Sequence, residues 1–180
     1  NVFCVGWNYL EHFKEGESWR QAKVDLPEHP VFFSKAASAV SGPFDPIPYD
    51  PKVSQEVDWE VELGVVIGAP GKNLSEAEAM GHVFGYTVVN DVSARDLQKQ
   101  HGGQWHKGKS LDGFCPMGPW LVTRDEIADP HRLPLHCRVN GVVKQDGNTR
   151  DMIYPVDAII EWASKGMTLL PGAIIATGTP

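Results

Sequence analysis

The alternation of apolar and polar positions predicts a chain built mainly from short strands. In the clearest of them, residues 59–67, the odd-numbered positions are all apolar and share one face. The opposite face carries Glu60 and Glu62 before it becomes apolar at Gly64 and Val66. A strand that enters a core with two glutamates on one face needs an explanation beyond packing.

The same pattern predicts further strands, at residues 2–6, 30–35, 83–91 and 115–123, and a strand after the turn in residues 169–180. Residues 135–145 read as a hairpin that turns at Asn140 and Gly141, two residue types that tolerate positive φ.

Helices are expected to be few. Residues 154–166 form the best candidate, with Pro155 in the first turn and Gly166 as the C-terminal cap. Ser75, with Glu78 three residues later, predicts a capping box at the start of a second helix, and Ser93 is expected to cap a third. Residues 8–19 leave room for one or two helical turns.

These elements predict an α+β fold that is mostly β, such as a β-roll, because they lack the regular strand–helix alternation of a doubly wound sheet. The chain has 180 residues, 42% of them hydrophobic, with no internal repeat or break in composition. We therefore expect one domain that spans residues 1–180.

Charge and composition exclude several classes of partner. The net charge of −7 argues against nucleic-acid binding, and no apolar run approaches the roughly 18 residues of a membrane helix. No signal segment is evident at the start, which favours a cytoplasmic protein. Cys4, Cys115 and Cys137 form an odd, widely spaced set, so we expect reduced thiols and no disulfide framework.

Glu60 and Glu62 have two interpretations. Two residues apart in a strand, they project from the same face about 6.6 Å apart, at a rise of about 3.3 Å per residue. Such like charges repel, and a divalent cation between them would remove that cost. The alternative is a half-exposed strand with one wet face, which is common. Asp91, at the end of residues 83–91, could supply a third carboxylate and favours the metal.

Seven segments in order resemble the fumarylacetoacetate hydrolase family, in the branch of bacterial acylpyruvate, diketo-sugar-acid and ureidoglycolate enzymes. They are "VGWNYLEHFKEG", "PVFFSKAASAVSG", "DWEVELGVVIG", "GYTVVNDVSARDLQ", "GGQWHKGKSLDGFCPMGP", "VNGVVKQDGNT" and "TLLPGAIIATGTP". The resemblance implies the mixed β-sandwich roll of that family's C-terminal domain. It also implies further strands beyond Pro180 and a homodimer, which six tryptophans in 180 residues weakly support.

The resemblance implies a metal site made by Glu60, Glu62 and Asp91, which would bind Mg²⁺, or else Mn²⁺ or Ca²⁺. It implies a catalytic dyad of His12 and Glu15 on a short helical lid, in which the glutamate raises the basicity of the imidazole. As bare sequence, a histidine and a glutamate three residues apart are more often a solvated pair.

The remaining site residues also follow from the resemblance. Lys109 would lie near the metal and stabilise an oxyanion or enolate. Arg95 and Gln98 would contact the substrate, Gln104 would form pocket wall beside Trp105, and Thr179 would bind a substrate carboxylate. Lys35 could add positive potential. Without the resemblance, these positions read as solvated loop and helix residues, a core tryptophan and a turn.

Taken together, the resemblance implies a metal-dependent hydrolase that cleaves a carbon–carbon bond in a short 2,4-diketo acid through a metal-stabilised enolate. The partner would be a small keto acid. Decarboxylation, dienoate isomerisation and lysis of ureidoglycolate use the same kind of site and stay open. So do a non-catalytic domain with a structural metal and a metal-free interaction domain.

Overall fold

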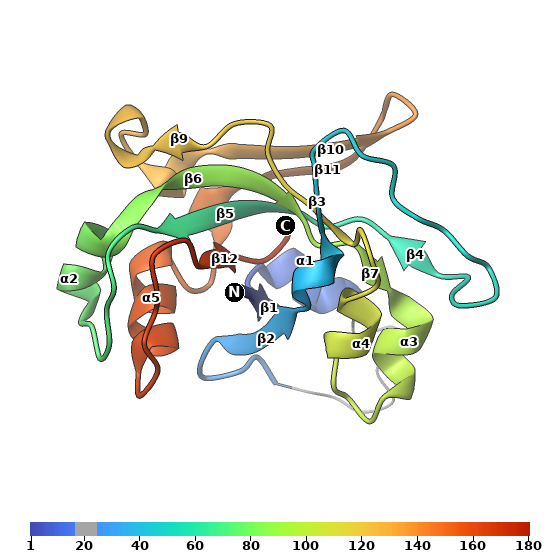
Figure 1. The fold of residues 1–180 in the computed structure, drawn as a ribbon, viewed down its shortest axis with the longest axis horizontal. Coiled ribbons are helices and arrows are strands. Elements are labelled where there is room, and N and C mark those ends of the chain that lie inside the picture. The colour runs from blue at the N-terminus through green and yellow to red at the C-terminus, as the bar shows by residue number, and fades with distance from the viewer. Residues whose placement is uncertain (17–24) are drawn as a thin grey trace.

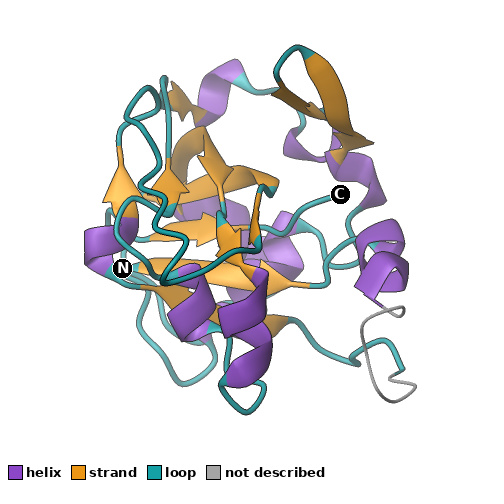
Figure 2. Cartoon of the chain, turned by 90° about the vertical axis from the view of Figure 1, so that its right-hand side faces the viewer, coloured by secondary structure: helices purple, strands orange, loops and turns teal. Residues whose placement is uncertain are grey.

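A mixed sheet forms the centre of the fold in the computed structural model, which describes residues 1–16 and 25–180. Within the described residues the sheet has six strands in the order β2-β1-β12-β5-β6-β9. β1 runs parallel to β12, and the other neighbours are antiparallel. In Figure 2 the strands gather in the middle of the molecule and most helices lie around them. The mostly β, α+β fold expected from the sequence is confirmed.

The elements of the described chain follow in order, with short 3₁₀ turns between some of them. The strands are β1 Val2–Gly6, β2 Val31–Lys35, β3 Val40–Ser41, β4 Val57–Asp58, β5 Val61–Ile67, β6 Val83–Asn90, β7 Ser93–Ala94, β8 Cys115–Pro116, β9 Val122–Thr123, β10 Pro134–Val139, β11 Val142–Asn148 and β12 Ile174–Ala176. The helices are α1 Leu10–Glu15, α2 Glu76–Ala79, α3 Arg95–Gln100, α4 His106–Lys109 and α5 Val156–Ser164.

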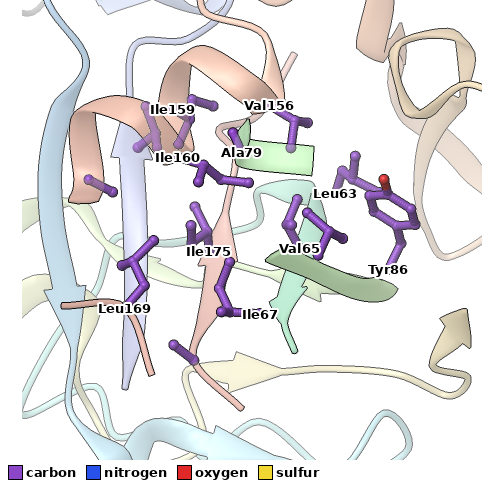
Figure 3. Close-up of a cluster of buried hydrophobic side chains, with 14 residues drawn as sticks. Leu63, Val65, Ile67, Ala79, Tyr86, Val156, Ile159, Ile160, Leu169 and Ile175 are labelled. Carbon is purple, nitrogen blue, oxygen red and sulfur yellow. The ribbon is translucent and has the colours of Figure 1, made fainter. Parts of the chain in front are cut away.

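The main core lies between α5 and the sheet. Ile159 and Ile160 of α5 are fully buried against side chains of β5 and β12, such as Val65 and Ile175 (Figure 3). α2 lies beside α5 at one end of the sheet, and α3 and α4 lie at the other end (Figure 1). Every residue of β5 is buried, so this strand is covered on both of its faces.

Several local predictions are confirmed by the backbone. Asn140 and Gly141 have φ of 51° and 79° in the hairpin of β10 and β11, and Gly166 has a φ of 73° just after α5. The capping box of Ser75 and Glu78 is present at the start of α2.

Two local predictions are wrong. Residues 115–123 do not form one strand, because Pro116 and Pro119 lack the N–H that a continuous ladder needs, and the segment divides into β8 and β9. Ser93 does not cap a helix. It lies in β7, its hydroxyl donates to the Asp91 carbonyl, and α3 begins two residues later at Arg95.

Other predicted features are placed as follows. Of the predicted turns in residues 8–19, the structure gives α1, and residues 17–19 lie outside the described chain. All three cysteines are free. No helix among the described residues has the length and apolar character that a membrane crossing requires.

Candidate active site

Three buried carboxylates converge where β5 begins and β6 ends. Antiparallel pairing puts Val61 opposite Asn90, and the Asp91 amide donates to the Glu60 carbonyl at 2.8 Å. This register brings Asp91 beside the two glutamates. Glu60, Glu62 and Asp91 are at most 4% exposed, and each offers an oxygen within 4.8 Å of the others. The interpretation of a wet strand face is therefore wrong.

Three cations, Lys109, Lys35 and Arg95, surround this cluster. Lys109 of α4 bridges two of its members, with Nζ 2.6 Å from Glu60 Oε2 and 2.9 Å from Asp91 Oδ2. Lys35, at the end of β2, pairs with the other oxygen of Asp91 and also donates to the Val92 carbonyl at 3.1 Å. From the sequence we expected Lys35 only to add positive potential, whereas in the structure it forms a buried ion pair with Asp91.

The two glutamates differ in their electrostatic environment. Burial alone would raise the pKa of Glu60, but Lys109 and Arg95 outweigh burial and hold it well below its ordinary range. The pKa of Glu62 is raised well above its ordinary value by burial, and the charges of Asp91 and Glu60 add to the effect. The Gly178 amide donates to Glu62 Oε2 at 2.7 Å and offsets only part of this. Glu62 is thus the carboxylate that most lacks positive charge.

The chemistry of this donor set fits a hard divalent cation. All three donors are carboxylate oxygens, which suit Mg²⁺, Mn²⁺ or Ca²⁺ better than softer metals. Their oxygens already converge, and Glu62 would gain the counter-charge that it lacks. Glu60, Glu62 and Asp91 are therefore the residues that would hold the metal, and Lys109 Nζ would move from between two of them.

His12 lies beside the cluster on α1, which follows β1. Its Nε2 is 3.9 Å from Glu60 Oε1, and its Nδ1 is 3.7 Å from Glu15 Oε2. Both distances are longer than a hydrogen bond. The structure therefore places His12 and Glu15 near each other, as predicted, at a separation greater than that of a hydrogen-bonded dyad. Burial lowers the pKa of His12, although Glu60 opposes the effect, which favours the neutral imidazole. Its catalytic role and the movement of α1 stay predictions.

Arg95 is held firmly at the first residue of α3. Its Nε and Nη2 donate to Asp58 Oδ2 at 2.9 and 2.8 Å, and its Nη1 lies 2.6 Å from Glu60 Oε1. The same Nη1 donates to Gln98 Oε1 at 3.2 Å. Arg95 and Gln98, which the sequence placed together at the substrate, are thus neighbours at the cluster. Asp58 was not anticipated from the sequence. Its position two residues before Glu60 would place it on the same face of an extended segment as Glu60 and Glu62.

A cavity of about 620 Å³ opens beside the cluster. Its walls include His12, Arg95 and Thr179, together with Trp59 and the exposed Lys144, whose Nζ lies 5.7 Å from the centre of the Trp59 ring. A separate, smaller hollow is lined by Glu60 and Glu62 and shares His12 and Thr179 with the larger cavity.

Trp105 forms part of the wall of that smaller hollow. A Cβ at Gly6 would stand 2.2 Å from its ring, so glycine is required there for the tryptophan to pack. Gln104, the neighbour of Trp105 in the chain, lines neither of these two cavities: it is exposed, and its side chain accepts from the His106 amide at 3.2 Å.

Thr179 lies in a segment that continues β12 along the edge of β5. Its hydroxyl donates to the Val61 carbonyl at 2.8 Å and accepts from Gln145 Nε2 at 2.6 Å. In this arrangement the hydroxyl proton is engaged, so a substrate contact through Thr179 stays a prediction. Gln145 was not anticipated, because nothing in a polar hairpin position distinguishes it from a solvated residue.

Comparison with known proteins gives one consistent result. Residues 1–180 match the family described as fumarylacetoacetate (FAA) hydrolase C-terminal. A mitochondrial oxaloacetate tautomerase of Xenopus laevis is 52% identical over 180 residues, which cover 99% of this chain and 54% of the relative. The chain therefore spans about half the length of the curated relatives that it matches.

Two solved structures have the same fold over nearly the whole of this chain. A 2-hydroxyhepta-2,4-diene-1,7-dioate isomerase from Mycobacterium marinum is 46% identical, with a TM-score of 0.85 over 99% of this chain and 63% of its own. A fumarylacetoacetate hydrolase from Exiguobacterium antarcticum is 48% identical, with a TM-score of 0.87 over 100% of this chain and 62% of its own.

Proposed function

The chain belongs to the fumarylacetoacetate hydrolase family, and on that premise we propose that it catalyses metal-assisted keto–enol proton transfer on a short 2-keto dicarboxylic acid such as oxaloacetate. The observation that carries the proposal is the buried triad of Glu60, Glu62 and Asp91, with the imidazole of His12 3.9 Å from Glu60. An oxaloacetate tautomerase and a dienoate isomerase among the relatives support proton transfer next to a 2-keto group.

A divalent cation on the three carboxylates would act as a Lewis acid toward the oxygens of the 2-keto acid. The neutral imidazole of His12 would take a proton from the carbon next to the keto group and, as the imidazolium, return it to the enolate oxygen. The same two transfers in reverse would convert the enol to the keto form. Lys109 would offset negative charge that develops on that oxygen. Arg95, fixed by Asp58, would keep the carboxylate of Glu60 in place.

The cavity also offers a contact for a second carboxylate at Lys144, in a lining that also carries the acidic Glu15, Asp58 and Asp146. The carboxylate next to the keto group would lie at the metal site formed by the triad. Lys144, an exposed residue of the cavity wall beside Trp59, would attract the second carboxylate. A 2-keto acid without the second carboxylate would lose this contact and bind more weakly.

Hydrolysis of a carbon–carbon bond in an acylpyruvate is the second candidate. The observation in its favour is Glu15, whose Oε2 lies 3.7 Å from His12 Nδ1 and would raise the basicity of the ring if the two closed to a hydrogen bond. In that case His12 would deprotonate a water that attacks the distal carbonyl. Proton transfer to and from carbon needs no such water and agrees better with the names of the relatives.

We also propose a homodimer. Large apolar side chains are exposed on β6 and the neighbouring segment before β9, namely Phe84, Val88, Trp120 and Leu121. The Trp120 carbonyl accepts from the Thr87 hydroxyl, which holds that segment against β6. Exposed apolar groups that gather in this way are typical of a contact surface. The cytoplasmic location stays a prediction of the sequence; the Xenopus relative is mitochondrial by name.

The test follows the decay of enol-oxaloacetate by ultraviolet absorbance, with protein and Mg²⁺ or Mn²⁺. We expect a faster decay that a chelator abolishes and that Glu60→Ala loses together with metal affinity. No acceleration of this decay, alongside metal-dependent cleavage of an acylpyruvate, would replace the first candidate by the second.

A further inference from the structure

Hydrogen bonds from side chains form a closed ring around Val61, the residue between two proposed metal ligands. The Val61 amide donates to Gln145 Oε1 at 2.9 Å. Gln145 Nε2 donates to Thr179 Oγ1 at 2.6 Å, and the Thr179 hydroxyl donates to the Val61 carbonyl at 2.8 Å. Both backbone polar groups of Val61 are thereby fixed by two side chains from distant parts of the chain.

The chemistry of the partners sets the direction of each bond in the ring. The Val61 N–H can only donate, so the amide oxygen of Gln145 must face it. The Gln145 nitrogen also donates to the Pro180 carbonyl at 3.0 Å, which agrees with the same orientation of the amide. The Val61 carbonyl can only accept, which leaves Thr179 as its donor. No alternative orientation of the Gln145 amide satisfies all of these groups.

The ring replaces strand pairing at the point where pairing stops. The ladder between β12 and β5 ends at Ala176 and Gly64. Beyond it, the Thr177 amide and hydroxyl both donate to the Leu63 carbonyl, at 3.1 and 2.9 Å. The Gly178 amide then binds Glu62, and the Thr179 hydroxyl binds Val61. Figure 1 shows the C-terminal end of the chain in the middle of the molecule, beside β5.

We infer that Gln145 is a positioning residue of the metal site, which acts through the Val61 backbone to hold Glu60 and Glu62 at the spacing that one cation requires. The Val61 N–H belongs to the peptide that joins it to Glu60 and its C=O to the peptide that joins it to Glu62, so a rotation of either peptide group would change the relative orientation of the two carboxylates. Mg²⁺ demands near-ideal geometry from its ligands. Groups outside the ligands that orient them commonly change metal affinity by 10–100-fold. Gln145 reaches the site from β11, so the hairpin becomes part of the metal centre.

The inference rests on the metal site of the proposed function, although it does not depend on the reaction. The experiment is therefore a calorimetric titration with Mn²⁺ alone. Gln145→Met keeps the length of the side chain and removes both hydrogen-bonding groups. His136→Gln is the matched control, because it removes the His136–Asp146 pair of the same hairpin, at 3.0 Å, and leaves the ring intact.

We expect Gln145→Met to weaken Mn²⁺ binding by roughly 10-fold or more, and His136→Gln to bind as the wild type does. Thr179→Val should weaken Mn²⁺ binding similarly, whereas Thr179→Ser, which keeps the hydroxyl, should bind Mn²⁺ as the wild type does. The double variant of Gln145→Met with Thr179→Val should bind Mn²⁺ no more weakly than the weaker single variant, because either change opens the same ring. Thermal melts would report any loss of stability separately.

Mn²⁺ affinity in Gln145→Met within twofold of the wild type would overturn the inference, even if the melting temperature fell. Additive losses in the double variant would overturn it as well. If Gln145→Met does not fold, the two Thr179 variants provide the test. Weakened Mn²⁺ binding in Thr179→Val but not in Thr179→Ser would support the ring. Equal Mn²⁺ affinity in the two variants would refute it. A wild type that binds no Mn²⁺ would instead refute the proposed function.

Discussion

Glu62→Gln separates two effects of the buried Glu62 carboxylate. The carboxylate destabilises the metal-free protein at neutral pH, and it is a proposed ligand of the metal. The pKa of Glu62 is raised well above its ordinary value of 4.5 by burial and by the charges of Asp91 and Glu60. The folded metal-free protein therefore binds a proton here that the unfolded chain releases, and its stability falls as pH rises from about 4.5 to the raised pKa. A single proton contributes at most about 1.4 kcal/mol per pH unit.

Glutamine has the same shape, still accepts from the Gly178 amide and does not ionise. We therefore expect the metal-free variant to be at least as stable as the metal-free wild type at pH 7, with an advantage that shrinks toward pH 4.5. Mn²⁺ at 100 times its Kd should add about 2.7 kcal/mol to the wild type. For a chain of this size that raises Tm by about 5–11 °C, at roughly 2–4 °C per kcal/mol.

The assay is a thermal melt of both proteins with and without Mn²⁺, at several pH values. The wild type should gain stability from the metal and the variant should gain almost none. An equal gain in both proteins would show that Glu62 is not a ligand. A metal-free variant that melts well below the wild type at pH 7 would refute the electrostatic reasoning.

Three other predictions concern His12, Lys144 and the proposed dimer surface. His12→Ala should keep Mn²⁺ affinity and lower kcat on oxaloacetate by roughly 10²–10⁴-fold, with little change in KM; a large loss of metal affinity, measured by titration, would contradict this. Lys144→Met should raise KM for oxaloacetate more than for a 2-keto acid with one carboxylate, and equal changes would refute its role. Light scattering should give the mass of a dimer at micromolar concentration and that of a monomer for Trp120→Glu; a monomeric wild type would end the dimer proposal.

Those parts of the fold that depend on interactions between neighbouring residues were predictable from the sequence. The Asn140–Gly141 turn and the Ser75–Glu78 capping box depend on a few neighbouring residues and are found as expected. The strand after Trp59 follows from alternation, although it begins at Val61. The break in residues 115–123 was missed because alternation outweighed two prolines whose missing N–H groups should have counted.

The candidate site was only partly predictable. Glu60 lies just before β5 and Glu62 lies within it, two residues apart, so their spacing alone suggests a common face, and the register of β5 against β6 adds Asp91. The partners of these groups come from far along the chain. Lys35 and Gln145 reach the site from β2 and β11, at sequence distances where periodicity carries no information. Their roles depend on tertiary packing that only the folded structure contains.

The most direct test of the account is a structure of the protein crystallised with Mn²⁺ and measured for anomalous scattering. We predict one manganese peak in contact with an oxygen of each of Glu60, Glu62 and Asp91, and Lys109 Nζ displaced from at least one of the two carboxylates that it bridges without metal. A map with no peak at the triad, and with Lys109 still 2.6 Å from Glu60 and 2.9 Å from Asp91, would contradict the metal centre on which the proposed function depends.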